Sequence, residues 1–486
     1  MLSLLPPKAM QIKSLRISLL LILWLGIPAR SQDTPAQPPN PGVPSVTNSG
    51  TTTGNNLHPK QAPGPGAETG GEEGGINQRP FVFVLPRDHF LGDWWGLRTE
   101  LENAGITPTL TYVSDIGANV TGGKNQGGSY DDNIGLNLLM DMDKIANIEG
   151  GTFLLSMSQR DGNSLSQRHV GNVFTIQQVY GGETFKIIDA AWQQKLLDDR
   201  VELRIGRIAA GDDFLVSKYD YWFMQNGFDG NPVGIFLNAP GMTAYPNSAW
   251  GALVKFIPTK RTYIMAGIYD GDTSIRSNEY HGLGLSMHGP IFAIGEMGYR
   301  CNGLPGDSDY LGDYKIGYWY DDSLYSEYGT EGYAYGAADR RGNFGIYGLF
   351  DQVVLPWGPQ YSSRGLGVFG SVLVSPDQSV SQMPYFFTAG MTGRGFTDAR
   401  PTDIAGFGVV YGQFSDELHA AEVREDALGQ PITAQGHEAV LELTYRFNMD
   451  NRSLFFQPDL QYVIRPGGSS RVHDAFVIGC QIGVNF

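Results

Sequence analysis

Polar and apolar residues alternate along most of the chain that follows residue 105. Between Leu110 and Val120, for example, apolar side chains occupy most even positions, while Thr, Asp, Gly and Asn occupy most odd positions. The same period of two recurs in residues 133–143, 201–205, 438–447 and 476–486. Since successive side chains of a β-strand point to opposite faces, this period predicts strands that have one apolar and one polar face. We therefore expect residues 106–486 to be all-β.

Short turns and long loops separate these predicted strands. Residues 198–200 and 448–451 have the composition of tight turns, whereas residues 321–341 form a long stretch rich in Gly, Asp and Tyr. Strands joined in this way are typical of an antiparallel up-and-down barrel. At about 45 to 50 residues for each hairpin with a long loop, the chain holds about eight hairpins, which predicts about 16 strands, with 14 and 18 as alternatives.

The apolar face of such a barrel can meet either a protein interior or lipid. Strands of about ten residues fit a tilted membrane crossing. Aromatic residues such as Tyr318, Trp319 and Tyr320 are expected at strand ends, where they would form an interfacial girdle. We therefore expect the apolar faces to meet lipid and the polar faces to surround a water-filled lumen.

The beginning of the chain predicts export. Basic residues precede an apolar run over residues 17–27, which is too short to cross a bilayer as a helix. Ala29 and Ser31 supply small residues at the recognition positions, so residues 1–31 are interpreted as a signal peptide, with an uncleaved anchor as the alternative. Residues 32–80 contain no aromatic residue and many Pro and Gly residues. They cannot bury enough apolar surface to offset chain entropy, which predicts a disordered arm.

Residues 81–105 form an N-terminal segment with one short predicted helix. Asp93 is a candidate cap for a helix over residues 94–104, and Gly105 is a candidate for its end. The helix would carry Trp94 and Trp95. Because it is too short to be stable alone, it must dock on another part of the protein.

Charge and cysteine content exclude several classes of protein. Removal of the signal takes away four of the 34 basic residues and none of the 50 acidic ones, which leaves a net charge of −20. Binding to nucleic acid needs a basic surface, so no nucleic-acid partner is expected. The two cysteines, Cys301 and Cys480, do not form a disulfide framework.

The last residues, DAFVIGCQIGVNF, place an aromatic residue at the C-terminus. Phe486 shares its parity with Val484, Ile482 and Ile478, which predicts that it lies on the lipid-facing side of the final strand. As the edge of a soluble sheet, a strand this apolar would invite aggregation. We expect the final strand to close the barrel against the first, and to be recognised by the outer-membrane assembly machinery.

Several stretches resemble the carbohydrate-selective porin (OprB-type) family. They include LGDWWGLRTELENAGITPTLTY, RIGRIAAGDDF, AYPNSAWGALVKFIP, RGLGVFGSVLVSP and FFQPDLQYVIRPGG, in the order of that family. The resemblance covers about residues 90–486 and implies a 16-stranded outer-membrane barrel that admits mono- and small oligosaccharides by passive diffusion. We expect sugars as transported solutes, outer-membrane lipid as surroundings, a monomer or a homotrimer, and no cofactor. A general or cation-preferring porin is the alternative within the same class.

Arginines at the end of one predicted strand are candidates for the pore constriction. Arg204 has the polar parity between Leu203 and Ile205, and an arginine that faced lipid would cost about 2–4 kcal/mol near the midplane. It should therefore point into the lumen. Arg207 has the wrong parity unless Gly206 permits a bulge or the strand has ended. In the resembling family this stretch lies near the pore lining, so both arginines are candidates.

A loop that follows this strand supplies the remaining candidates. Residues 211–230 contain no clear strand and are rich in aromatic residues, which favours a loop folded into the barrel mouth. Asp213 and Lys218 are then candidate polar partners of a sugar, and Trp222 is a candidate stacking ring. The alternative is that these aromatic residues only pack the loop onto the rim. Glu438 and Glu442 have the lumen parity and are interpreted as solvated wall charges.

Two alternative functions belong to classes other than channels: an outer-membrane hydrolase and a surface sugar-binding β-protein. The eight histidines are scattered, and no G-x-S-x-G or H-E-x-x-H stretch occurs. Glu438 and Glu442 would lie about 13 Å apart along a strand, beyond the roughly 5–9.5 Å that glycosidase carboxyl pairs use. We therefore predict no catalytic residue, no metal site and no enzyme.

Overall fold

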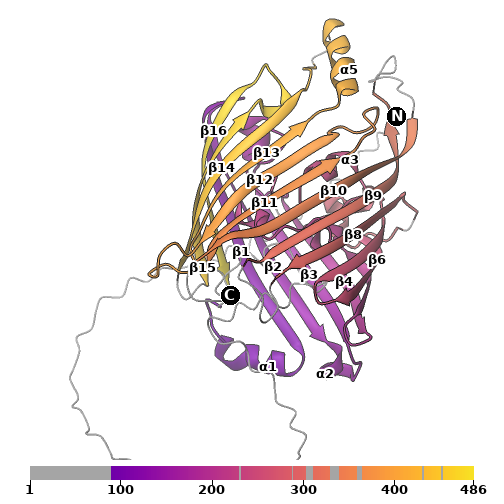
Figure 1. The fold of residues 1–486 in the computed structure, drawn as a ribbon, viewed down its shortest axis with the longest axis vertical. Helices are drawn as coiled ribbons and strands as arrows, with labels where there is room; N and C mark the ends of the chain where they lie inside the picture. Colours follow the sequence, from indigo (N-terminus) through magenta and orange to yellow (C-terminus); the bar gives the residue numbers. More distant parts are fainter. Residues whose placement is uncertain are drawn as a thin grey trace, which may run out of the picture. The chain divides into compact units, whose positions relative to one another are not determined.

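The computed structural model describes residues 89–228, 231–286, 288–302, 310–328, 339–357, 364–429, 432–449 and 453–486. Within these ranges, 16 strands form a closed antiparallel barrel in which each strand pairs with its neighbours along the chain (Figure 1). β16 closes the barrel against β1, with Ile478 opposite Ala118 and Val484 opposite Tyr112. The predicted fold class is therefore confirmed. The predicted signal peptide and the predicted arm lie outside the described residues.

The strands are β1 (Ile106–Gly123), β2 (Gly127–Asp141), β3 (Gly151–Gly162), β4 (Thr184–Leu196), β5 (Val201–Ile208), β6 (Ala249–Thr259), β7 (Thr262–Asp270), β8 (Ile291–Cys301), β9 (Gly312–Ser326), β10 (Asp339–Pro356), β11 (Gly365–Val374), β12 (Tyr385–Arg394), β13 (Ile404–Gln413), β14 (His437–Met449), β15 (Leu454–Ile464) and β16 (His473–Asn485). The described α-helices are α1 (Leu97–Asn103), α2 (Met142–Ala146), α3 (Gly234–Asn238) and α5 (Asp416–Ala427). Single turns of other helix types are η1 (Trp94–Gly96), η2 (Ser166–Val170), η3 (Ala210–Asp212), η4 (Asp220–Trp222), η5 (Ser274–Arg276), η6 (Asn278–Tyr280) and η8 (Pro466–Gly468).

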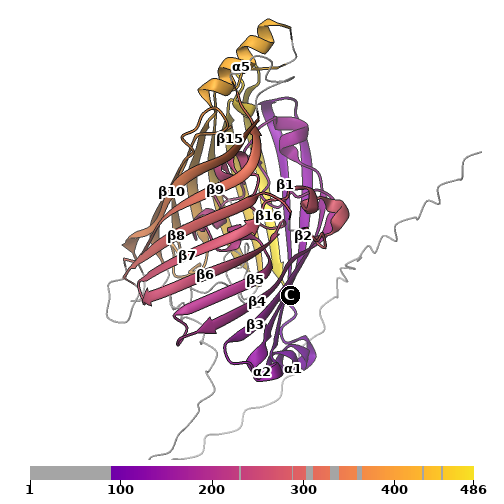
Figure 2. The ribbon, with the colours of Figure 1, turned by 90° about the vertical axis from the view of Figure 1, so that its right-hand side faces the viewer.

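The two ends of the barrel differ. The tight turns between β4 and β5 and between β6 and β7 lie at the same end as α1, α2 and Phe486, which we call the turn end (Figure 2). The opposite end carries α5 and is called the loop end (Figures 1 and 2). Among the described residues, no helix has the length and hydropathy needed to cross a membrane.

The strands have the two faces that the sequence predicts. In β14, Glu438, Glu442 and Arg446 are buried inside the barrel, whereas Leu443 and Phe447 are exposed on the outside. The same alternation holds in β1 and β16. One expectation about the outer face is wrong, because residues 318–320 lie in the middle of β9 rather than at its end, and Trp319 points inward.

Two long loops fold into the barrel and fill much of its interior. They are the first inner loop, residues 163–183 between β3 and β4, and the second inner loop, residues 209–248 between β5 and β6 apart from residues 229–230. Phe223 and Phe228 of the second inner loop stack on each other and contact Phe369 of β11. Glycines of the wall make room for these rings, since a Cβ atom on Gly408 would lie 2.5 Å from the ring of Phe228. The interior is therefore partly an apolar core, which explains inward-facing apolar residues such as Val440.

The N-terminal helix begins later than predicted. Trp94 and Trp95 have φ angles of 49° and 57°, in the left-handed region, so α1 starts at Leu97. Gly96 and not Asp93 is the N-cap residue of α1, although the Asp93 carboxylate accepts the backbone N–H of Thr99 in the first turn at 2.9 Å. Gly105, with a φ angle of 91°, follows the end of the helix as predicted.

Candidate functional site

Carboxylates of the barrel wall hold the inner loops by their backbone. Glu438 accepts the N–H groups of Val173 at 2.9 Å and of Phe174 at 2.7 Å, both in the first inner loop. Glu442 accepts the N–H of Met224 at 2.6 Å, in the second inner loop. The interpretation of Glu438 and Glu442 as solvated wall charges is therefore wrong. Sequence parity gives the direction of these side chains, but it does not reveal that a loop covers them.

Carboxylates on the opposite side of the barrel wall also accept backbone N–H groups of the second inner loop. Glu296 of β8 accepts the N–H of Leu215 at 2.9 Å. Asp351 of β10 accepts the hydroxyl of Ser217 at 2.6 Å and the N–H of Lys218 at 2.9 Å. Hydrogen bonds to ionised groups are stronger than neutral ones, so residues 215–218 are held in a defined position across the barrel.

Arg204 and Asp213 form an ion pair inside the barrel. Arg204 Nη1 lies 3.1 Å from Asp213 Oδ2, and both side chains are 3% exposed. Asp213 belongs to the second inner loop, and burial raises the pKa of its carboxyl to about 6, although the charge of Arg204 acts in the opposite direction. The predicted inward direction of Arg204 is confirmed.

Lys218 takes part in a second charge cluster. Its ammonium lies 2.8 Å from Asp313 Oδ2, and Arg300 Nε lies 3.0 Å from the other oxygen of the same carboxylate. Lys315 donates to the carbonyl oxygen of Val216 at 2.5 Å. Lys218, Arg300 and Asp313 keep side-chain exposures of 28%, 20% and 17%, so this cluster, unlike the pair of Arg204 and Asp213, is accessible from the lumen.

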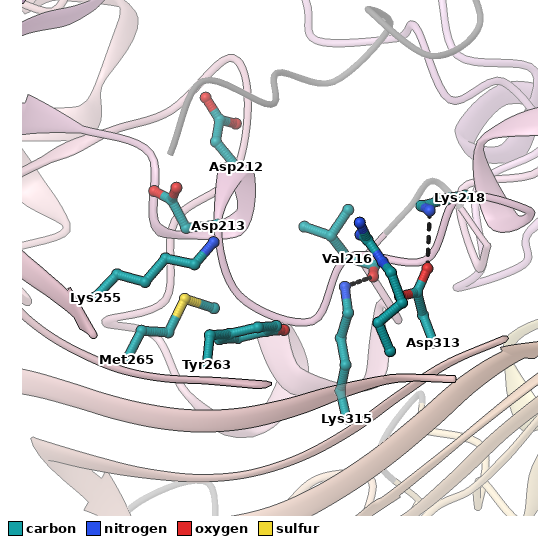
Figure 3. Close-up of a pocket in the computed structure, with 10 residues that line it drawn as sticks. Asp212, Asp213, Val216, Lys218, Lys255, Tyr263, Met265, Asp313 and Lys315 are labelled. Atoms are coloured by element: carbon teal, nitrogen blue, oxygen red, sulfur yellow. Dashed lines mark hydrogen bonds and ion pairs between the residues drawn. The ribbon is translucent and has the colours of Figure 1, made fainter. Parts of the chain in front are cut away.

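A pocket lies between the second inner loop and the wall formed by β6 to β9. Figure 3 shows Lys255 and Lys315 reaching from the wall toward the loop segment that carries Asp213 and Val216. Several of its wall residues lie within a few positions of the ends of β6, β8 and β9 that belong to the turn end. The pocket is lined by Asp212, Asp213, Val216, Lys218, Lys255, Tyr263, Met265, Arg300, Asp313 and Lys315.

An aromatic ring lies within this charged lining. The ammonium of Lys255 is 4.6 Å from the centroid of the Tyr263 ring. The Tyr263 hydroxyl donates to Glu296 Oε1 at 2.6 Å, while Glu296 Oε2 holds the second inner loop. The pocket thus presents cationic donors, carboxylate acceptors and a ring around a cavity of about 40 Å³, which has room for hydroxyl groups at the edge of a solute but not for a whole sugar ring.

Arg207 lies apart from this pocket, toward the loop end. It is buried, and its guanidinium donates to the carbonyl oxygens of Gly284 and Ser248, each at 3.2 Å. Gly206 has a φ angle of 139°, and a Cβ atom there would lie 2.4 Å from the carbonyl oxygen of Ala190. Strand parity alone would place the Arg207 side chain on the outer face. Arg207 is instead buried, and it follows directly after Gly206, whose positive φ angle departs from regular strand geometry.

Trp222 lies against a different part of the wall. The guanidinium of Arg446 on β14 is 5.1 Å from the Trp222 ring, and the Trp222 carbonyl oxygen accepts the side-chain amide of Gln457 at 2.9 Å. The structure therefore brings Asp213 and Lys218 to one pocket, with Arg204 behind Asp213, and leaves Arg207 and Trp222 elsewhere.

The pocket residues on the barrel strands were not predicted from the sequence. Lys255, Asp313 and Lys315 have the lumen parity of their strands, because Val254, Phe256, Tyr314 and Ile316 beside them are exposed on the outside. That parity was available as a signal. Which of the many inward charges face the second inner loop depends on the closed barrel, which the sequence does not give. Among the described residues, no cluster of His, Cys, Asp and Glu side chains is arranged to hold a metal ion.

Comparison with known proteins identifies relatives of this chain. The family model of the carbohydrate-selective porin, OprB family, matches residues 125–486. Porin B of Pseudomonas aeruginosa is 28% identical over 433 residues, which cover 82% of this chain and 91% of that protein. The putative porin QuiX of Acinetobacter baylyi is 27% identical over 437 residues, which cover 82% of this chain and 93% of that protein.

A solved structure agrees with the architecture. The high-pH structure of Pseudomonas putida OprB superposes with a TM-score of 0.77 and 26% sequence identity, and the match covers 83% of this chain and 100% of that one. The fold of this chain thus has a structural counterpart over 83% of its length.

Proposed function

We propose that mono- and small oligosaccharides diffuse through the lumen of this barrel, past the pocket beside the second inner loop. The chain belongs to the carbohydrate-selective porin, OprB family, and is an outer-membrane carbohydrate porin. The observation that carries this proposal is the mixed lining of that pocket. Lys218, Arg300 and Asp313 supply hydrogen-bond donors and acceptors, and Tyr263 supplies a ring. A channel must bind its solute weakly enough to release it, and partly exposed polar groups meet that condition.

Within this proposal, Arg204 is a positioning residue. It pairs with Asp213 and does not itself line the pocket. Arg207 and Trp222 keep the proposed role in the constriction that we predicted from sequence, at positions in the lumen away from the pocket. Family resemblance supports Arg207 in this role, and the contact with Arg446 supports an ordered Trp222.

The cellular setting extends the proposal. We propose export by cleavage of residues 1–31, a spacer role for residues 32–80, insertion guided by the final strand ending at Phe486, and a monomer or homotrimer in the membrane. In barrels of this kind the short turns face the periplasm. The turn end, with the pocket near it, would then be the side at which sugars leave. A role as a hydrolase or a surface sugar-binding protein is the alternative of another class, and release of product from a sugar would support it.

Conductance in planar bilayers tests the role of the pocket. Glucose and maltose are expected to reduce the ion current by occupying the lumen. In Arg204→Ala, Asp213 loses its partner, so we expect half-block to need roughly threefold to tenfold more sugar, as for a loss of about 1 kcal/mol. Arg341→Ala is the matched control, because Arg341 is 65% exposed and pairs with Asp322, and neither residue lines the pocket. Sugar block that is equal in both variants and the wild type would remove Arg204 and Asp213 from the pathway.

A further inference from the structure

An apolar edge projects from the N-terminal segment at the turn end. Trp95 is 98% exposed, and Phe90, Leu91 and Leu97 beside it are each about half exposed. We call these four residues the N-terminal apolar edge. Proteins rarely expose several large apolar side chains together without a partner, so this edge requires something to cover it.

The edge is held firmly and is not a loose end. Trp94 and Trp95 both have left-handed φ angles, a conformation that bulky residues keep only when their surroundings impose it. The guanidinium of Arg98 stacks on Trp94 with 4.5 Å to the ring centroid. The same guanidinium donates to the carbonyl oxygen of Pro108 at 3.1 Å and to Phe486 at 2.6 Å. The exposure of Trp95 is thus built into the structure that joins the two ends of the barrel chain.

The edge continues the outer face of the barrel. The backbone N–H of Phe90 donates to the carbonyl oxygen of Asn485 at 2.7 Å, and the Phe90 ring meets the Phe486 ring edge-to-face at 6.5 Å. Phe486 has the parity of Ile478, which is exposed on the outside of β16. The apolar outer face therefore runs from β16 through Phe486 and Phe90 to the N-terminal apolar edge, beyond the ends of the strands.

Lipid is the occupant that this continuity favours. The outer face of a porin meets hydrocarbon over its middle, and the bilayer boundary falls near the ends of the strands. Tryptophan is enriched at that boundary, because its ring is apolar while its N–H can reach water or headgroups. We propose that the N-terminal apolar edge lies in the headgroup layer of the leaflet at the turn end, where Trp95 anchors the barrel to lipid outside the barrel wall itself. A second copy of the chain or a soluble protein would cover the edge without using its continuity with the lipid-facing surface.

Spin labels test this proposal in the full chain, reconstituted in phosphatidylcholine vesicles. With Cys301 and Cys480 replaced by serine, single labels are placed by Trp95→Cys, Ile205→Cys and Leu428→Cys. Ile205 is 62% exposed on the outer face of β5 and reports lipid, while Leu428 is 80% exposed at the end of α5 and reports water. We expect the label at residue 95 to be reached by oxygen nearly as well as the label at residue 205, and by a water-soluble nickel complex several-fold less than the label at residue 428.

Two results would overturn the proposal. Access of the nickel complex equal to that at residue 428 would place Trp95 in water, and low access of both reagents would show that protein covers it. Tryptophan fluorescence gives a second readout without labels. Lipids brominated near the headgroup should quench the wild type more than Trp95→Phe, and equal quenching of the two proteins would contradict the proposal. Heat-modifiable migration verifies that each variant has folded.

Discussion

At the scale of single residues, the direction of a side chain is decided by strand parity, and its function by what the inner loops bring against it. Parity predicted that Arg204 points inward. It also predicted that Arg207 could do so only if Gly206 changes the course of the backbone or the strand has ended. It did not predict that Asp213 would meet Arg204, because a residue in a loop has no parity and its position depends on the folded loop. The ion pair at 3.1 Å is therefore a result of tertiary structure.

The pair of Arg204 and Asp213 predicts a pH-dependent ion selectivity. With a pKa raised to about 6, the Asp213 carboxyl is ionised at pH 7.5 and mainly neutral at pH 5. Protonation leaves the charge of Arg204 uncompensated, so the permeability ratio of potassium to chloride should fall between pH 7.5 and pH 5. Reversal potentials across a potassium chloride gradient measure this ratio.

Asp213→Asn provides the control for this titration. The variant should resemble the acidic state at both pH values and show a smaller change than the wild type. A change of the same size in both proteins would assign the titration to other groups. Because the folded pKa lies above the ordinary value of 3.8, this carboxyl also lowers the stability of the folded protein as pH rises from about 4 to about 6 and has a constant effect above that range.

At the scale of elements, the strands follow from the period of two, whereas the inner loops do not. The sequence indicated that residues 211–230 fold inward, because so many aromatic residues would not remain in water. It gave no comparable signal for the first inner loop, whose residues Phe174 and Ile176 are fully buried. The start of α1 at Leu97 was also missed, since the left-handed turn at Trp94 and Trp95 lies beside Arg98, which stacks on Trp94 and donates to Pro108 and Phe486, residues outside the helix.

The anchoring of the first inner loop gives a prediction at this scale. Glu438 accepts backbone N–H groups from Val173, Phe174 and Gly467, and Glu438→Gln replaces one accepting oxygen by a donor. An unsatisfied buried N–H costs about 1–3 kcal/mol. We therefore expect amide hydrogen exchange of peptides over residues 170–176 to become roughly tenfold or more faster.

Glu417→Gln is the matched control for this experiment. Glu417 is exposed in the first turn of α5, where the same chemical change removes no contact with an inner loop. Exchange over residues 170–176 that stays the same in Glu438→Gln and in the control would show that Glu438 does not hold the loop.

At the scale of the whole barrel, closure joins the ends of the described chain into one structure. The final strand, read from parity alone, was expected to close against the first, and β16 does pair with β1. Strand number followed from chain length, since the long loops consume a predictable share of the residues. The filling of the lumen did not follow, because the volume that two inner loops occupy depends on packing between loops and wall.

The central feature proposed for this barrel is that carbohydrates cross the membrane through its lumen beside the second inner loop. Swelling of liposomes that contain the purified protein measures this passage directly, in isotonic glucose, maltose and larger maltose oligomers. We expect the fastest swelling in glucose, slower swelling with each added sugar unit, and sugars that are recovered chemically unchanged. Swelling in glucose no faster than in liposomes without protein, or recovery of cleaved sugar, would contradict it.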